Sequence, residues 1–251
     1  TEKSTGSFIA GAGYSSVDRL VGQLEINNGN LFGKGHLLRA RSELGERRTT
    51  YSLTFREPYL LDSTFSGTVD LFNQVRTFNA FNDLRENQYQ EKRVGGSLIV
   101  GKSFGEYLHA SLSHTRENLL LFDVGANAPA LIQDQARLGE TQTHALGFSM
   151  TRDTRDFIFD PKQGARNALS LEYAGTFLGG DNDYYKVTVD SGRFFPSILT
   201  HVVSLHGHVG FADGVEGKTL PVGERFFVGG INSVRGFRFG RAGPITVFIM
   251  V

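Results

Sequence analysis

The chain has 251 residues, and 26 Lys plus Arg balance 26 Asp plus Glu, so the formal net charge at pH 7 is zero. A neutral chain has no overall field that draws it to nucleic acid, and we expect no nucleic-acid partner. The chain contains no cysteine, which excludes disulfides and thiolate metal sites.

The composition favours strands and turns over helices. The chain contains 31 Gly, 21 Phe and 8 Tyr but only 6 Pro, a usage typical of sheets joined by tight turns. Its longest apolar runs, such as ITVFIMV at the end of the sequence, fall far short of the roughly 20 residues that a membrane-spanning helix needs. The first six residues lack the basic and apolar succession of a signal peptide, so we expect none in this sequence.

A period of two begins in the first third of the chain. Residues 7–14, SFIAGAGY, form the first candidate strand. In LVGQLEI, Leu24 and Ile26 share one face. Gln23 and Glu25 share the other. LLRARSEL and TYSLTFR repeat this separation, so one face of the predicted sheet is apolar and the other is polar.

The same alternation continues to residue 211. It recurs in TFSGTVDLF, VGGSLIVG, YLHASLSH, THALGFSM, NALSLEYAG, YYKVTVDSG and HVVSLHGHVGF. The sequence therefore holds about eleven candidate strands, several of about ten residues, a length that suits tilted membrane strands.

Turn sequences separate these candidate strands. They are NNGN, LGERR, EPYLLDS, GEY, LGGDNDY, FFPSI and ADGVEGK. Two connections are longer, over residues 77–91 and 123–140, as expected for a barrel whose two rims face different compartments. A large soluble β-sandwich also alternates by twos and is the alternative. Strand length and the asymmetry of the rims favour an all-β, antiparallel transmembrane β-barrel.

Residues suited to catalysis or metal binding form no convincing cluster. His206 and His208 share a face, but no cysteine and no carboxylate of that strand accompanies them, so we interpret them as lining a lumen. DNDYYK begins like a calcium loop and lacks the later glycine and glutamate. GFSM lacks the second glycine of a nucleophile elbow. The sequence thus predicts no enzyme, no cofactor and no metal.

Several segments, in a fixed order, carry a family resemblance. NGNLFGKG and FREPYLLD come first, and RDFIFDPKQGARNALSLEYAG follows with Asp156, Pro161 and Gly164. GGDNDYYKVTVD comes next, and VGGINSVRGF follows VGERFF near the end. These segments resemble those of the BamA family of outer-membrane protein assembly factors, whose superfamily includes the two-partner secretion pores. The resemblance extends from about Gly6 to about Pro244.

The resemblance implies a sixteen-stranded barrel in which a long loop, here residues 212–244, folds back into the lumen. In the family the arginine of this loop pairs with an acidic residue of the inner wall, so Arg235 is the expected cation, with Phe237 packed beneath it. Asp70, Asp156 and Asp190 are the acids of this chain that we consider as partners. The glycines of the motif give the backbone its freedom. The motif residues are Gly229, Gly230, Val234, Arg235, Gly236 and Phe237.

The resemblance also implies a lateral seam where the first strand meets the last. The seam residues of the first strand are Ser7, Phe8, Gly11, Gly13 and Tyr14. Gly11 and Gly13 weaken strand packing, as a seam that opens requires. Small residues that fit a crowded barrel corner would give the same sequence, and both interpretations stay open.

The function that the resemblance implies is folding and insertion of other outer-membrane proteins through this seam, whose edge strand templates an incoming hairpin. The implied partners are unfolded outer-membrane proteins, outer-membrane lipids, periplasmic repeats and accessory lipoproteins, and the implied location is the outer membrane. A secretion pore that passes an extended polypeptide is one alternative, and a passive porin is another. Because Ile245–Val251 does not resemble the family, we interpret residues 1–251 as a partial barrel domain without the periplasmic repeats and the last strands.

Overall fold

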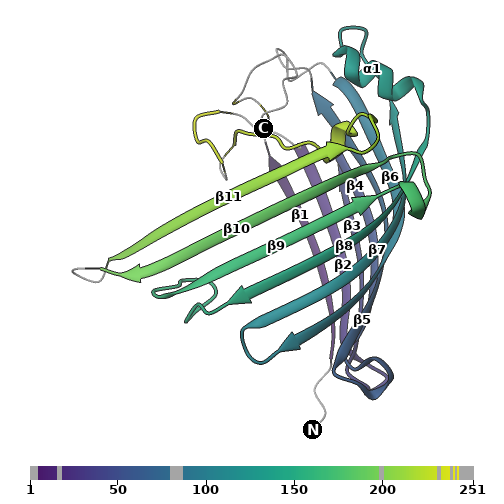
Figure 1. Ribbon diagram of the computed structural model, residues 1–251. Coiled ribbons are helices and arrows are strands. Elements are labelled where there is room, and N and C mark those ends of the chain that lie inside the picture. The colour runs from purple at the N-terminus through teal and green to yellow at the C-terminus, as the bar shows by residue number, and fades with distance from the viewer. Residues whose placement is uncertain are drawn as a thin grey trace.

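The structure, a computed structural model, describes residues 5–15, 19–79, 87–197, 201–230, 233–237, 240 and 242. Within them, eleven strands form one antiparallel sheet whose spatial order is the order of the sequence (Figure 1). The strands are β1 (Gly6–Ser15), β2 (Arg19–Leu31), β3 (His36–Gly45), β4 (Arg48–Glu57), β5 (Phe65–Asn79), β6 (Asn87–Phe104), β7 (Leu108–Phe122), β8 (Thr141–Asp153), β9 (Gly164–Ala174), β10 (Tyr184–Pro196) and β11 (Val202–Gly214). Every strand predicted from the alternation is therefore confirmed.

The register places the predicted apolar positions on one face. Leu24 of β2 lies opposite Ala10 and Ser42, and Leu53 of β4 lies opposite Ala40 and Leu71. Residues directly opposite each other in antiparallel strands point to the same side of the sheet. We call the side with these leucines the outer face and the opposite side the inner face.

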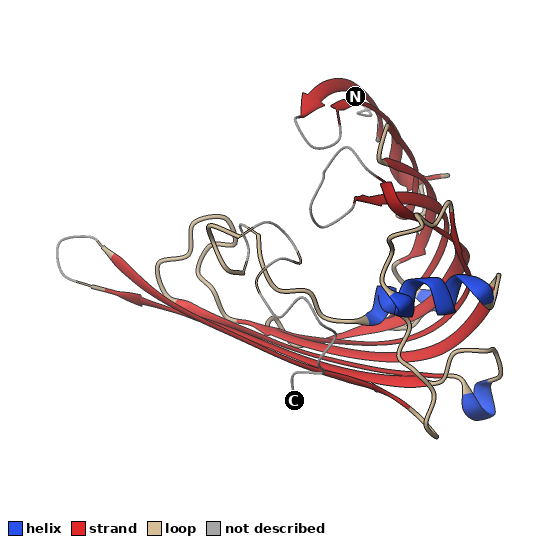
Figure 2. Ribbon diagram, turned by 90° about the horizontal axis from the view of Figure 1, so that it is seen from above, coloured by secondary structure: helices blue, strands red, loops and turns tan. Residues whose placement is uncertain are grey.

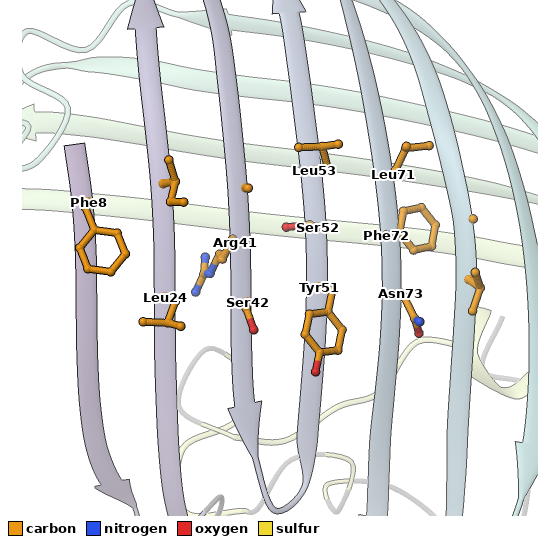
Figure 3. Close-up of a pocket in the computed structure, with 14 residues that line it drawn as sticks. Phe8, Leu24, Arg41, Ser42, Tyr51, Ser52, Leu53, Leu71, Phe72 and Asn73 are labelled. Carbon is orange, nitrogen blue, oxygen red and sulfur yellow. The ribbon is translucent and has the colours of Figure 1, made fainter. Parts of the chain in front are cut away.

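The outer face is apolar although it is open. Phe8 is 68% exposed, Leu24 49% and Leu71 51%. Figure 3 shows Leu53 and Leu71 side by side in the shallow hollow that these side chains line on β1 to β6. A contiguous apolar surface of this kind marks a membrane or protein contact in place of a water-facing surface.

The sheet curves into an open trough (Figure 2). Within the described residues, β1 and β11 each pair with a single neighbour and not with each other. Each of these strands therefore presents one edge of backbone N–H and C=O groups without a ladder partner in the sheet.

The two rims of the trough differ. In an antiparallel meander the connections that follow odd-numbered strands share one rim, which we call the loop rim, and the others share the turn rim. Of the two long connections predicted from the sequence, the one over residues 123–140 joins β7 to β8 at the loop rim, where the chain that follows β11 also lies. The other was predicted too long, because β5 and β6 extend into residues 77–91 and only residues 80–86 separate them. At the turn rim the connections range from three residues between β6 and β7 to ten between β8 and β9.

Two local features differ from what the sequence indicated. The connection between β7 and β8 contains a helix, α1 (Ala130–Arg137), which the composition did not indicate. In addition, β2 continues through the NNGN sequence to Leu31, and the turn follows at residues 32–35. The side chain of Asn30 moves this turn, because its Oδ1 accepts a 2.6 Å hydrogen bond from the backbone N–H of Gly35.

No helix in the described part of the chain combines the length and the apolar character needed to cross a membrane.

Candidate functional site

Charged side chains gather on the inner face near the loop rim. The alternation puts Glu91 and Arg93 of β6 and Glu117 of β7 on this face, and Lys186 of β10 also points to it. Arg93 donates through Nε to Glu91 Oε1 at 2.8 Å and through Nη1 to Glu117 Oε1 at 3.1 Å. The Glu91 side chain is only 4% exposed, so these charges are buried in the wall of the trough.

The chain after β11 folds back onto this cluster. The short 3-10 turn η4 (Val222–Glu224) carries Glu224 to Arg93 Nη1, which lies 2.8 Å from Glu224 Oε1. Lys186 Nζ lies 3.2 Å from the other carboxylate oxygen of Glu224. A single guanidinium thus holds carboxylates from two strands and from the returning loop. We call Glu91, Arg93, Glu117, Lys186 and Glu224 the anchor cluster.

Two glycines make the close approach possible. A Cβ at Gly223 would lie 1.9 Å from an Arg93 nitrogen, so any other residue there would displace the guanidinium. A Cβ at Gly210 of β11 would lie 2.6 Å from the Phe226 ring, which therefore rests directly on the strand. Lys186 Nζ lies 5.4 Å from the centroid of the same ring.

The electrostatics of Glu224 favour its ionised form. Burial by itself would raise the pKa of Glu224, but Arg93 and Lys186 more than offset the burial and hold its pKa below the ordinary value. The carboxylate is therefore charged at neutral pH, and removing one of its two cations would leave a buried charge with only part of its compensation.

An apolar core at the loop rim supports the same segment. Val222 is 5% exposed and packs among Tyr89, Leu119, Leu121, Ala128 and Ile132 of β6, β7 and the α1 connection. The Val222 N–H also donates to Gln135 Oε1 of α1 at 2.9 Å. Helix α1, at the loop rim in Figure 1, therefore holds the returning chain against the wall.

The predicted motif lies farther along this loop and is more open. Gly229, Gly230 and Gly236 adopt φ of +121°, +97° and +92°, conformations that favour glycine. The Gly230 N–H donates to the Phe237 carbonyl at 2.8 Å, which closes the loop. Val234 is 40% exposed and Phe237 is 54% exposed.

Arg235 is exposed, and within the described residues it takes part in no ion pair. The three acids considered as its partners have other neighbours. Asp70 accepts from Thr54 Oγ1, Asp190 lies 2.7 Å from His208 Nδ1, and Asp156 lies at the opposite rim. The pairing role of Arg235 and the packing role of Phe237 stay predictions.

The aspartate, proline and glycine motif forms the β8–β9 connection at the turn rim. Asp156 Oδ1 accepts from the backbone N–H groups of Phe157 and Lys162, both at 2.9 Å, and from Gln163 at 3.3 Å. These hydrogen bonds lower the pKa of Asp156. Pro161 lies within the loop that they close. Gly164 has a φ of +99°, and a Cβ there would collide with the Thr154 carbonyl, so the motif fixes this turn.

The seam residues lie on an open edge strand. Phe8 and Tyr14 of β1 are 68% and 79% exposed, and Ser7 is exposed as well. A Cβ at Gly11 or Gly13 would have no atom within 4 Å among the described residues. The seam and the barrel-corner interpretations of these two glycines both stay predictions.

The two histidines of β11 lie on the inner face, where His208 Nδ1 meets Asp190 of β10. No group of three or more potential metal ligands occurs in the described ranges. The sequence did not single out the anchor cluster. Its signal was the placement of Arg and Glu at inner-face positions, together with the glutamate of VGERFF.

Comparison with known proteins decides the family. A model described as the Omp85 superfamily domain matches residues 30–247. The chain belongs to the Omp85 superfamily. The outer membrane protein assembly factor BamA of Nitratidesulfovibrio vulgaris is 28% identical over 94% of this chain and 29% of its own length. BamA of Neisseria meningitidis is 27% identical over 97% of this chain and 32% of its own length.

More distant Omp85 relatives and a solved structure agree. The sorting and assembly machinery component 50 homolog of Xenopus tropicalis is 26% identical over 96% of this chain and 48% of its own length. The crystal structure of BamA from Haemophilus ducreyi lacking POTRA domains 1-3 matches with a TM-score of 0.82, 23% identity, and coverage of 97% of this chain and 48% of that chain. The fold is thus that of the BamA barrel, and this chain spans less than half the length of these relatives.

Proposed function

We propose that this Omp85 chain forms part of the barrel wall of an outer-membrane β-barrel assembly factor, which folds and inserts other outer-membrane proteins. The relatives named BamA and sorting and assembly machinery component 50 support assembly over secretion and over a passive porin. Unfolded outer-membrane proteins are the proposed substrates. Periplasmic repeats and accessory lipoproteins remain proposed partners.

The observation that carries this proposal is the similarity to the assembly factors named BamA and sorting and assembly machinery component 50 over 94% to 97% of this chain. Strand β1 pairs with β2 along one side, and its other side is where the proposed seam would offer backbone groups to an incoming strand. Gly11 and Gly13 of this strand have no side chains to pack against a neighbour, as a seam that opens requires. Main-chain pairing is sequence-tolerant, which suits a protein that handles many different substrates.

Cysteine crosslinking of the full-length protein tests the proposal, since residues 1–251 contain no cysteine of their own. With Ser7→Cys on β1, we expect a crosslink to a cysteine in a stalled substrate hairpin. Ser111→Cys on β7, another serine on the inner face but within the sheet interior, is the matched control. Equal crosslinking from both positions, or none from Ser7→Cys while the protein remains folded, would contradict a templating edge.

A further inference from the structure

The apolar outer face of β8, β9 and β10 is interrupted toward the turn rim, whereas on β11 it continues through Leu205 and Val203. Met150, Leu169, Val189 and Val209 lie opposite one another across these four strands. Two residues closer to the turn rim, the register brings Arg152, Asn167, Ser191 and Gly207 into one row on the same face. On β8, β9 and β10 the outer face thus changes from apolar to cationic and polar within one step of the alternation.

Arginine on a lipid-facing strand position is strongly unfavourable at the bilayer midplane and close to neutral at its interfaces. The row of Arg152 therefore fits the level at which the strands leave hydrocarbon and meet lipid headgroups. Arg193 of β10 lies one row closer to the turn rim. Its guanidinium carbon lies 5.0 Å from the centroid of the Phe195 ring, the kind of aromatic neighbour found at membrane interfaces.

The two arginines border one hollow of about 370 Å³, which we call the arginine hollow. Strand β9 separates them and Arg193 is one row closer to the turn rim, so their Cα atoms stand about 12 Å apart, a gap that two arginine side chains can close on a shared ligand. Ser191 Oγ donates to Asn167 Oδ1 at 2.8 Å, which orients the amide between the two arginines. The lining residues are Arg152, Thr154, Gly164, Ala165, Asn167, Ser191 and Arg193.

The charge of the arginine hollow is not balanced within the described residues. Arg152 and Arg193 are both exposed, and neither lies within ion-pair distance of a carboxylate there. Arg93 of the anchor cluster, in contrast, holds three carboxylates. Two guanidinium groups at the border of an apolar band therefore have no protein anion to balance their charge among these residues. A guanidinium group binds phosphate well, because its paired N–H donors match two phosphate oxygens.

We propose that the arginine hollow binds the phosphate of an anionic lipid headgroup. A lipid fits both parts of this surface, because its acyl chains can cover the row of Met150 and Leu169 while its phosphate meets the two arginines. The inference rests on the membrane location contained in the proposed function. It does not depend on whether the protein assembles other proteins.

The test measures lipid retention by the full-length protein. The protein is reconstituted in phosphatidylcholine vesicles with and without phosphatidylglycerol, extracted in mild detergent, and its bound lipids are counted by native mass spectrometry. The wild type should retain phosphatidylglycerol over phosphatidylcholine. The variants Arg152→Gln and Arg193→Gln should each weaken this preference about five-fold, and the double variant should abolish most of it.

Arg116→Gln is the matched control, because Arg116 is exposed on the same outer face, opposite Gly96 and His144, nearer the loop rim. It should leave the preference unchanged. Heat-modifiable electrophoretic mobility shows whether the double glutamine variant folds. If it does not fold, the double variant Arg152→Lys with Arg193→Lys, which keeps the charge, replaces it and should show an intermediate preference for phosphatidylglycerol. A preference equal to that of the wild type would then overturn the proposal.

Two other results would overturn the proposal. One is a phosphatidylglycerol preference that survives the double glutamine variant. The other is loss of bound lipid on adding soluble glycerol phosphate at a matched concentration, which would assign the hollow to free phosphate. Failure of the crosslinking test with an intact lipid preference would count against assembly only, so the two ideas fail separately.

Discussion

Two segments of the chain after β11 are held very differently. Residues 222–226 lie against the inner face, with Glu224 bonded to Arg93 and Lys186 and with Val222 in an apolar core. Residues 233–237, which contain the family tetrad, are exposed. Among the described residues, the attachment of the loop to the wall thus comes from residues that precede the motif. A sequence motif does not by itself show which neighbouring residues attach the loop to the wall.

The greatest loss of stability is expected for Arg93→Met. Removing this cation leaves Glu91, Glu117 and Glu224 buried without their common partner, which should cost about 3–5 kcal/mol in the free energy of unfolding. Urea unfolding of the full-length protein measures it. Arg41→Met is the control, since Arg41 is 42% exposed beside Glu43 and should change the free energy by less than about 1 kcal/mol. Equal losses from both would show that the cluster is not an anchor.

A smaller effect, confined to the loop, is expected for Glu224→Gln. The amide keeps the shape of the side chain but loses two charge-assisted contacts, so attachment should weaken by about 1–3 kcal/mol and proteolysis within residues 215–237 should accelerate. Glu216→Gln, an exposed glutamate of the same loop, is the control. Unchanged proteolysis in Glu224→Gln would place the anchor elsewhere.

The same attachment should depend on pH in a defined direction. Because the pKa of Glu224 is held below its ordinary value, the contribution of this carboxylate is complete above the unfolded value of about 4.3 and is lost as the pH falls through the lowered pKa. In the wild type, proteolysis of the loop should therefore increase as the pH falls below about 4.3. In Glu224→Gln this increase should be absent, because the amide has no proton to take up.

The smallest effect on stability is expected for Arg235→Ala. An exposed arginine without an ion pair in the described residues should contribute less than about 0.5 kcal/mol to the unfolding of this sheet. In cells carrying the full-length protein, the same change should nevertheless lower the levels of other outer-membrane proteins if the tetrad acts in assembly. Arg137→Ala on α1, whose side chain is 74% exposed, is the control. Normal levels together with an unchanged protease pattern would remove Arg235 from the mechanism.

Much of the fold could be predicted, because the period of two is a local property. Leu24, Leu53 and Val187 are apolar between polar neighbours, and each lies on the outer face. Helix α1 was missed even though Pro129 precedes it and Gly139 follows it, both ordinary boundary signals. The turn after β2 was placed too early, because a side-chain hydrogen bond of Asn30 fixes where the strand ends.

The candidate site was less accessible to prediction. Alternation assigns Arg93 and Glu117 to the inner face, but it does not give the register that places them together, and Glu224 is separated from Arg93 by 131 positions. Gly223 carries no obvious signal either, since its role depends on how closely the guanidinium approaches. The arginine hollow likewise exists only because β8, β9 and β10 align Arg152 and Arg193 near one another.

Long antiparallel strands with one apolar and one polar face follow from local sequence, since side-chain direction along a strand is set by position alone. The order of the motifs indicated the family, which the match to the Omp85 superfamily domain confirms. Which charges meet and where the returning loop is attached became evident only in the folded sheet. These contacts depend on register and on segments far apart in the sequence, because buried charges gain stability only from the partners that folding brings to them.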